Sequence, residues 1–119
     1  RRHYYVKAMN LVRRMRDAYD RALGEYDLLL MPTAPAKARS LPPGDASPET
    51  VIDLAFENID NTCPFNLTHH PALTVPCGMV EGCPIGMMLA AKPFAETTLY
   101  VAAHAFAQAV DWRRLGCGG

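Results

Sequence analysis

The chain has 119 residues, which is enough for one small domain, and its formal net charge is zero. Half of the residues are hydrophobic and a fifth are charged, as is ordinary for a globular protein. Because neither sign of charge is in excess, no long-range field would draw the chain to nucleic acid or to a lipid surface. No apolar run reaches the roughly 18 residues of a membrane span. We therefore expect neither nucleic acid nor membrane as a partner.

The four cysteines, Cys63, Cys77, Cys83 and Cys117, form no CxxC pair and no small disulfide framework. Reduced thiols fit this pattern best, and they favour a cytoplasmic location. The adjacent histidines at 69 and 70 would point to opposite sides of an extended chain, so they rarely bind one ion together. We expect no metal and no cofactor. The first residue is Arg1 rather than Met, so we expect the chain to begin inside a longer reading frame.

Apolar residues recur at steps of three and four over residues 4–23, which predicts an amphipathic helix that ends at Gly24. An unbroken apolar run, 28–31, is closed by Pro32 and predicts a buried strand covered on both faces. Prolines punctuate residues 32–48, which we interpret as a long loop of the kind that often carries function.

Ser47 followed by Pro48 is typical of a helix start, and this helix is predicted to run to about Asn58. A short helical turn is expected over 62–70. Strands are then predicted at 72–77 and 85–91, with the reversal at 79–82.

Gly86 inside a strand predicts close approach by another backbone. The helix predicted over 96–112 is apolar nearly all round, which indicates burial between layers. Residues 113–119 show no periodicity, and we expect them to fray.

This α/β inventory needs more covering than 119 residues supply. We therefore expect a piece that is incomplete on its own, the end of a larger α/β domain, with sheet edges left unpaired. Such a piece is predicted to associate when isolated, and a homodimer is left open.

A hydrolase needs a nucleophile, a base and oxyanion donors. The only serines are Ser40, in the proline-rich loop, and Ser47, which is predicted to cap a helix. No lysine flanks a serine pair, so we predict no catalytic residue in this chain. The polar residues best placed to face a ligand are Thr33, Asn61 and Thr62, near the ends of predicted elements. Packing or capping remains an alternative role for each.

Three ordered stretches carry a family resemblance: YDLLLMPTAPAKA (26–38), NTCPFNLTHHPALTVPCG (61–78) and GCPIGMMLAAKPFAETTLYVAAHAF (82–106). Together they resemble the carboxyl-terminal end of amidase signature enzymes. The TVPCGM and PIGMML segments are most similar to bacterial amidases associated with nitrile degradation. His69 stands where the family usually has Gly; if that residue takes a positive φ, His costs about 1 kcal/mol or more there.

The resemblance implies a mixed sheet flanked by helices, with residues 1–112 as the carboxyl-terminal segment of an amidase domain and 113–119 as an irregular tail. It also implies hydrolysis of a small-molecule amide to acid and ammonia through a Ser–cis-Ser–Lys triad. That triad would lie upstream, in the rest of the parent chain, so the segment alone is expected to be inactive. The closing wall of the acyl pocket would then include five residues of this chain: Ile59, Asn61, Thr62, Thr33 and Pro35.

Two rival interpretations stay open at this point. The chain could be a non-catalytic remnant or an interaction piece of an amidase-like protein, which the His69 departure and the irregular tail would allow. It could also be a relative of the amidotransferase A subunit that releases ammonia for charged tRNA, which would need partner subunits.

Overall fold

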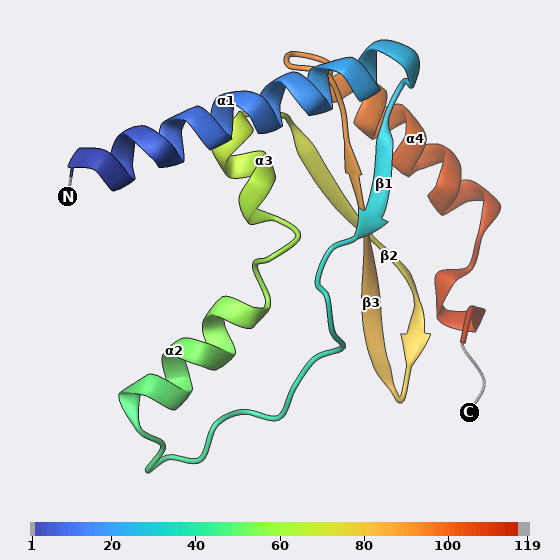
Figure 1. The fold of residues 1–119 in the computed structure, drawn as a ribbon. Coiled ribbons are helices and arrows are strands. Elements are labelled where there is room, and N and C mark those ends of the chain that lie inside the picture. The colour runs from blue at the N-terminus through green and yellow to red at the C-terminus, as the bar shows by residue number, and fades with distance from the viewer. Residues whose placement is uncertain (1, 117–119) are drawn as a thin grey trace.

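A computed structural model describes residues 2–116, and its centre is a three-stranded antiparallel sheet in the order β1-β3-β2 (Figure 1). The strands are β1 (Leu29–Pro32), β2 (Ala72–Val80) and β3 (Cys83–Ala90). The helices α1 (Arg2–Glu25) and α2 (Pro48–Glu57) lie on the amino-terminal side of β2 in the sequence, together with the short α3 (Cys63–Thr68). The helix α4 (Glu96–Ala109) and the 3-10 turn η1 (Trp112–Arg114) follow the sheet.

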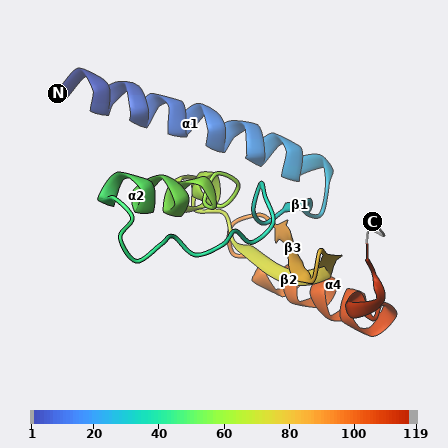
Figure 2. The ribbon, with the colours of Figure 1, turned by 90° about the horizontal axis from the view of Figure 1, so that it is seen from below.

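The predicted first helix is present, but it continues past Gly24 to Glu25. Gly24 does not take the left-handed conformation of a helix-ending glycine, since Gly82 is the only glycine with positive φ among the described residues. The Tyr26 N–H instead donates to the Ala22 carbonyl at 3.0 Å, which extends the helical hydrogen bonding. The carboxyl-terminal half of α1 buries Leu23, whereas its amino-terminal half projects away from the sheet (Figure 2).

The strand β1 forms where the apolar run predicts it and ends at Pro32, as expected. It pairs only with β3, with Leu29 opposite Ala90. The prediction that both of its faces are covered is wrong for this chain: Leu30 is 62% exposed, while Leu29 and Met31 pack on the core. The reason is that β1 is an edge strand and only one face of the sheet meets α1 and α3 there.

The β2–β3 hairpin is longer than predicted and turns over only two residues, Glu81 and Gly82, both with positive φ. Two consecutive positive φ values are typical of the tight turn that matches strand twist in hairpins. A register shift between Pro76 and Gly78 absorbs one residue of β2. Pro76 is therefore tolerated inside the strand, next to a bulge.

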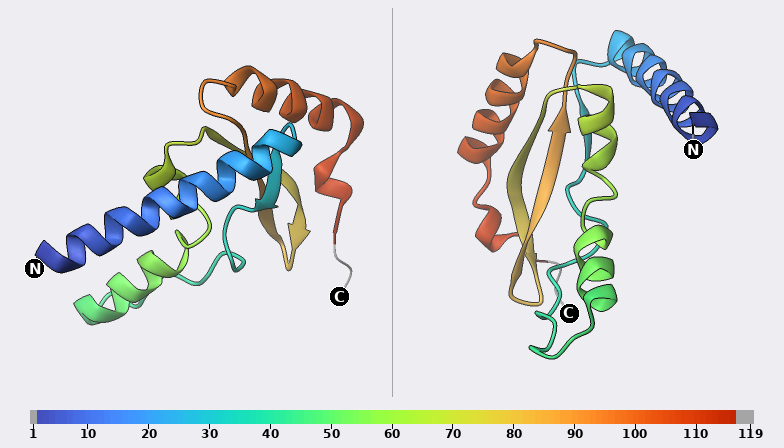
Figure 3. Two further views of the ribbon diagram at one scale, coloured as in Figure 1. Left: turned by 45° about the horizontal axis from the view of Figure 1, so that its top comes forward. Right: turned by 90° about the vertical axis from the view of Figure 1, so that its left-hand side faces the viewer.

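Ser47 caps α2 as predicted, its hydroxyl accepting a hydrogen bond from the Thr50 N–H at 3.2 Å. The last long helix, α4, ends at Ala109 rather than 112. Its predicted burial on all sides is wrong: Leu99 is buried, but Tyr100 is 65% exposed. The sheet packs against one side of α4 (Figure 3).

The residues after α4 are more ordered than the lack of periodicity suggested. The Met79 N–H of β2 donates to the Leu115 carbonyl at 2.7 Å, and Gly116 forms a parallel bridge with Met79. The expected fraying is therefore wrong for residues 113–116, because backbone pairing needs no apolar periodicity. Residues 117–119 lie outside the described part of the chain.

The two faces of the sheet carry separate core clusters. On one face Phe65, Met88 and Ala90 pack with Tyr19 of α1, and on the other Leu89 and Leu99 pack with Ala91. Many large apolar side chains nevertheless remain exposed, among them Tyr4, Val51, Ile52, Phe56 and Val101. This is a partial α/β fold, with helices on both faces of a small sheet and apolar surface left uncovered (Figure 3).

Candidate functional site

Thr33 directly follows β1 and is held against the middle of β3 and β2 by two contacts. Its N–H donates to the Gly86 carbonyl of β3 at 2.9 Å, and its Oγ1 lies 3.1 Å from Oγ1 of Thr74 on β2. Gly86 lies close to both threonine side chains. A Cβ added at Gly86 would be 2.7 Å from Thr33 Oγ1 and 2.9 Å from Thr74 Cγ2. The close approach expected at Gly86 therefore comes from two side chains, and not from a backbone.

Sequence reasoning missed Thr74 as the partner of Thr33. The two residues are 41 positions apart; Thr33 follows β1 and Thr74 lies on β2, and these two strands do not pair with each other. The available signal was Gly86 itself, because a glycine between two threonine-bearing strands leaves room for their hydroxyls to meet.

Asn61 is brought to the same end of β1. Its Nδ2 donates to the Pro32 carbonyl, the last of β1, at 3.0 Å across 29 residues. The chain leaves β1 at Thr33, so Thr33 and Asn61 flank the same strand end. Of the five predicted pocket-wall residues, these two are the pair that the structure brings together through β1.

Ile59 and Thr62 are joined to each other in the turn before α3. The Ile59 carbonyl accepts from Thr62 Oγ1 at 3.1 Å and from the Cys63 N–H at 2.8 Å. Thr62 is also the residue that precedes α3, without a side-chain capping bond. Ile59 is 40% exposed, and Pro35 is exposed in the loop after β1. The pocket-wall assignment of all five residues stays a prediction.

The serines show no nucleophile arrangement within the described residues. Ser47 is occupied as the cap of α2, and Ser40 lies in an exposed loop. In that loop Lys37 forms an ion pair with Glu81 of the hairpin turn, and Arg39 pairs with Glu57 at 2.9 Å. The two cations nearest to Ser40 in sequence, Lys37 and Arg39, are thus both paired with carboxylates.

The electrostatics of the α2 start follow from its capping. The pKa of Glu49 is lowered because a backbone N–H in the first helical turn, and then the Ser47 hydroxyl, donate to its carboxylate. Hydrogen bonds to the charged form of a carboxyl favour that form. Among residues 2–116 no group of three or more His, Cys, Asp or Glu side chains gathers closely enough to hold a metal ion.

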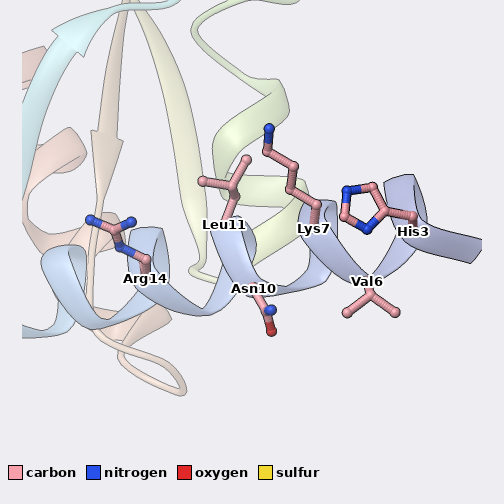
Figure 4. A pocket seen from close by; sticks show the side chains of 6 residues that line it. All are labelled: His3, Val6, Lys7, Asn10, Leu11 and Arg14. Carbon is pink, nitrogen blue, oxygen red and sulfur yellow. The ribbon is translucent and has the colours of Figure 1, made fainter.

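None of the five predicted residues lines the main surface hollows. One hollow lies between the 36–40 loop and the hairpin end, and a second between α3 and the start of α4. A third is lined by six residues that all belong to α1, including His3, Lys7 and Leu11 (Figure 4). One helix cannot enclose a small molecule, so this hollow is the unpartnered face of α1 rather than a binding pocket.

Comparisons with known proteins agree on one family. The family model described as Amidase matches residues 1–100. An uncharacterized protein in the nthA 5′ region of Rhodococcus erythropolis is 46% identical over 102 residues, covering 86% of this chain and 51% of that protein. An enantioselective amidase from Rhodococcus rhodochrous is 42% identical over 107 residues, covering 90% of this chain and 21% of that enzyme.

A solved structure shares the fold. It is a bacterial aryl acylamidase described as an amidase signature enzyme, with a TM-score of 0.70 and 28% identity, covering 87% of this chain and 22% of that one. Glutamyl-tRNA(Gln) amidotransferase A subunits are also relatives, one from Methanosarcina mazei at 38% identity. The chain thus spans between about a fifth and a half of the length of the curated relatives it matches.

The fold and the matched stretch define a class: the chain belongs to the amidase signature family. The resemblance predicted from the three sequence blocks is confirmed, and so is the partial α/β fold. None of the described helices is both long and apolar enough to cross a membrane.

Proposed function

We propose that this chain is the carboxyl-terminal segment of an amidase that hydrolyses a carboxylic acid amide to the acid and ammonia. The observation that carries the proposal is the family match over residues 1–100, supported by 42% identity to an enantioselective amidase. In this proposal the Ser–cis-Ser–Lys triad belongs to upstream chain. A lysine would act through the bridging serine on the nucleophilic serine, and backbone N–H groups would stabilise the oxyanion.

The uncovered apolar surface supports the segment proposal. Leu30 on β1, Val51 and Phe56 on α2, and Val101 on α4 all lie more than two-fifths exposed. Buried strands and amphipathic helices normally hide such side chains, and relatives that are several times longer have the chain to do so. The partner of this chain is therefore the rest of its parent amidase, in the cytoplasm.

Within that amidase, Thr33, Asn61 and Thr62 would form one wall of the acyl pocket, with Ile59 and Pro35 beside them. The hydrogen bond from Asn61 to the Pro32 carbonyl supports this role, because it fixes the turn bearing Ile59 against the end of β1. An apolar Ile59 would favour aliphatic or aromatic acyl groups over charged ones.

The first test uses the chain by itself. The purified chain should release no ammonia above buffer from simple aliphatic and aromatic amides. A variant in which both Ser40 and Ser47 are replaced by alanine is the matched control. Turnover that survives purification and is lost in that control would refute the placement of the nucleophile upstream. Turnover that persists in the control would refute the absence of any catalytic group in this chain.

The second test uses the parent reading frame. It should encode an upstream lysine and a Gly/Ser-rich block. In the parent enzyme Asn61→Ala should lower kcat/KM, while Asn58→Ala should not, because Asn58 only bonds the Leu54 carbonyl of its own helix at 3.1 Å. An equal effect of both substitutions would remove Asn61 from the pocket wall.

An amidotransferase A subunit is the second candidate, favoured by the 38% identity to a Methanosarcina mazei protein of that name. A parent that releases ammonia only when mixed with partner subunits would support this candidate. A parent frame without the lysine and serines would instead support the non-catalytic remnant. A homodimer of the parent is compatible with either enzyme.

A further inference from the structure

The carboxyl-terminal half of α1 is held to the rest of the molecule around one buried histidine. The His70 side chain is fully buried, its Nδ1 lies 2.9 Å from Thr68 Oγ1, and its Nε2 lies 3.1 Å from Asp20 Oδ1. Asp20 belongs to α1, fifty residues away in sequence. The Tyr19 ring of α1 packs edge-on against the same imidazole, with ring centroids 5.6 Å apart.

The hydrogens of this network can be counted from its donors and acceptors. Thr68 Oγ1 lies 3.0 Å from the Pro64 carbonyl, which can only accept, so the single hydroxyl hydrogen of Thr68 is used there. Thr68 Oγ1 must then accept from His70, which places a hydrogen on Nδ1. The Asp20 carboxylate can also only accept, which places a second hydrogen on Nε2. Every contact is satisfied only when the imidazole carries both hydrogens and a positive charge.

The charged and titratable groups around this imidazole come from three segments. From α1 there are the Asp20 carboxylate, the Tyr19 hydroxyphenyl ring and Arg16, whose Nε donates to the Thr68 carbonyl at 3.0 Å. His69 precedes it in the chain, and Glu96 of α4 lines the same hollow as His70. The surroundings of the ring thus hold two carboxylates, of Asp20 and Glu96, and one cation, of Arg16.

We propose that His70, Thr68 and Asp20 form a proton-dependent latch that fastens α1 to the start of β2. With both ring nitrogens protonated the latch is closed. When the imidazole gives up a proton, either Thr68 or Asp20 faces a lone pair instead of a hydrogen. If Asp20 faces the lone pair, the hydrogen bond that reaches α1 is lost; if Thr68 faces it, the bond to Asp20 remains but loses its charge assistance. This device does not depend on amide hydrolysis.

The test measures hydrogen exchange of the α1 amides in the native chain between about pH 5 and pH 8. Rates are corrected for the intrinsic pH dependence of exchange. Protection over the carboxyl-terminal half of α1 should fall about tenfold as pH rises, the effect expected for one lost charge-assisted hydrogen bond. A low protein concentration keeps association of the chain from masking the effect.

Asp20→Asn is the decisive variant. The carboxamide that it introduces can donate to a neutral imidazole or accept from a charged one, so it satisfies His70 in both states. Protection in this variant should become independent of pH. Asp20→Ala should weaken protection at every pH. The matched control is Asp17→Asn, which removes the same charge from an exposed position of the same helix and should retain the wild-type pH dependence.

Two results would overturn the latch. One is a wild-type protein with flat protection across this pH range. The other is an Asp20→Asn variant that loses α1 protection as Asp20→Ala does. If a variant fails to fold, ¹⁵N chemical shifts of the His70 ring in the native chain decide instead. Two protonated nitrogens in the closed state support the latch, and a single protonated nitrogen there refutes it.

Discussion

Replacing His69, where the resemblance implied a glycine, by glycine should stabilise the protein. His69 ends α3 with φ of 59° and ψ of 30°, the left-handed region in which a Cβ is strained. The condition stated for this position in the sequence analysis, a positive φ, is therefore met. The side chain is exposed, and no hydrogen bond of the described structure uses it, so little else is lost with it.

The magnitude follows from two opposing terms. Removing the Cβ from a residue in the left-handed conformation should stabilise the folded state by about 1–2 kcal/mol. Glycine also gives the unfolded chain more conformational freedom, which lowers the free energy of unfolding by about 0.4–1 kcal/mol. His69→Gly should therefore raise the free energy of unfolding by roughly 0.5–1 kcal/mol. His69→Ala keeps the Cβ and should show no such gain.

The assay is urea unfolding of the wild type and both variants, with equal slopes required for a valid comparison. The glycine variant should unfold at the highest urea concentration. A matched position exists in Phe94, which has φ of 65° and is 96% exposed, so Phe94→Gly should give a gain of similar size. If His69→Ala stabilises as much as His69→Gly, the backbone strain argument is refuted.

Three further predictions concern other positions. Gly86→Ala should destabilise by about 1–3 kcal/mol, read from urea unfolding, because its Cβ would meet the threonine pair; no loss would contradict the crowding there. Gly78→Ala should release the tail, since its Cβ would lie 2.8 Å from the Leu115 carbonyl; unchanged exchange of the neighbouring Met79 amide would contradict this. The lowered pKa of Glu49 stabilises α2 above its unfolded pKa, and this contribution should be lost as pH falls through the folded pKa. Ser47→Ala should reduce that acid-dependent loss, measured by amide exchange in α2, and an unchanged acid response would argue against the cap.

The local elements could be read from the sequence because their signals are local. The Ser47 cap, Pro32 at the end of β1 and the family blocks each depend on residues a few positions apart. The structure confirms the cap and the strand end, and the comparisons confirm the family. The predicted ends of the elements were less accurate. At Gly24 the helix continues, because a glycine can either end a helix or continue it. The hairpin turn is also shorter than predicted.

The candidate site was only partly predictable. The sequence placed Thr33 and Asn61 near element ends, and the structure brings both to the end of β1. The partner Thr74 was missed, because a contact between unpaired strands leaves no periodic trace in either one. The pocket-wall role of all five residues stays a prediction, since the proposed ligand would be enclosed by chain outside this segment.

The sequence by itself determined the family, the order of helices and strands, and the caps and turns that bound them, since these depend on short-range patterns. Only the tertiary structure decided which apolar faces are covered. It left Leu30 and Tyr100 exposed although their segments are apolar enough for full burial. It also joined Asp20 to His70 across fifty residues. The physical reason is the same in each case: burial and long-range pairing depend on which surfaces meet in space, and no local pattern of residues records that.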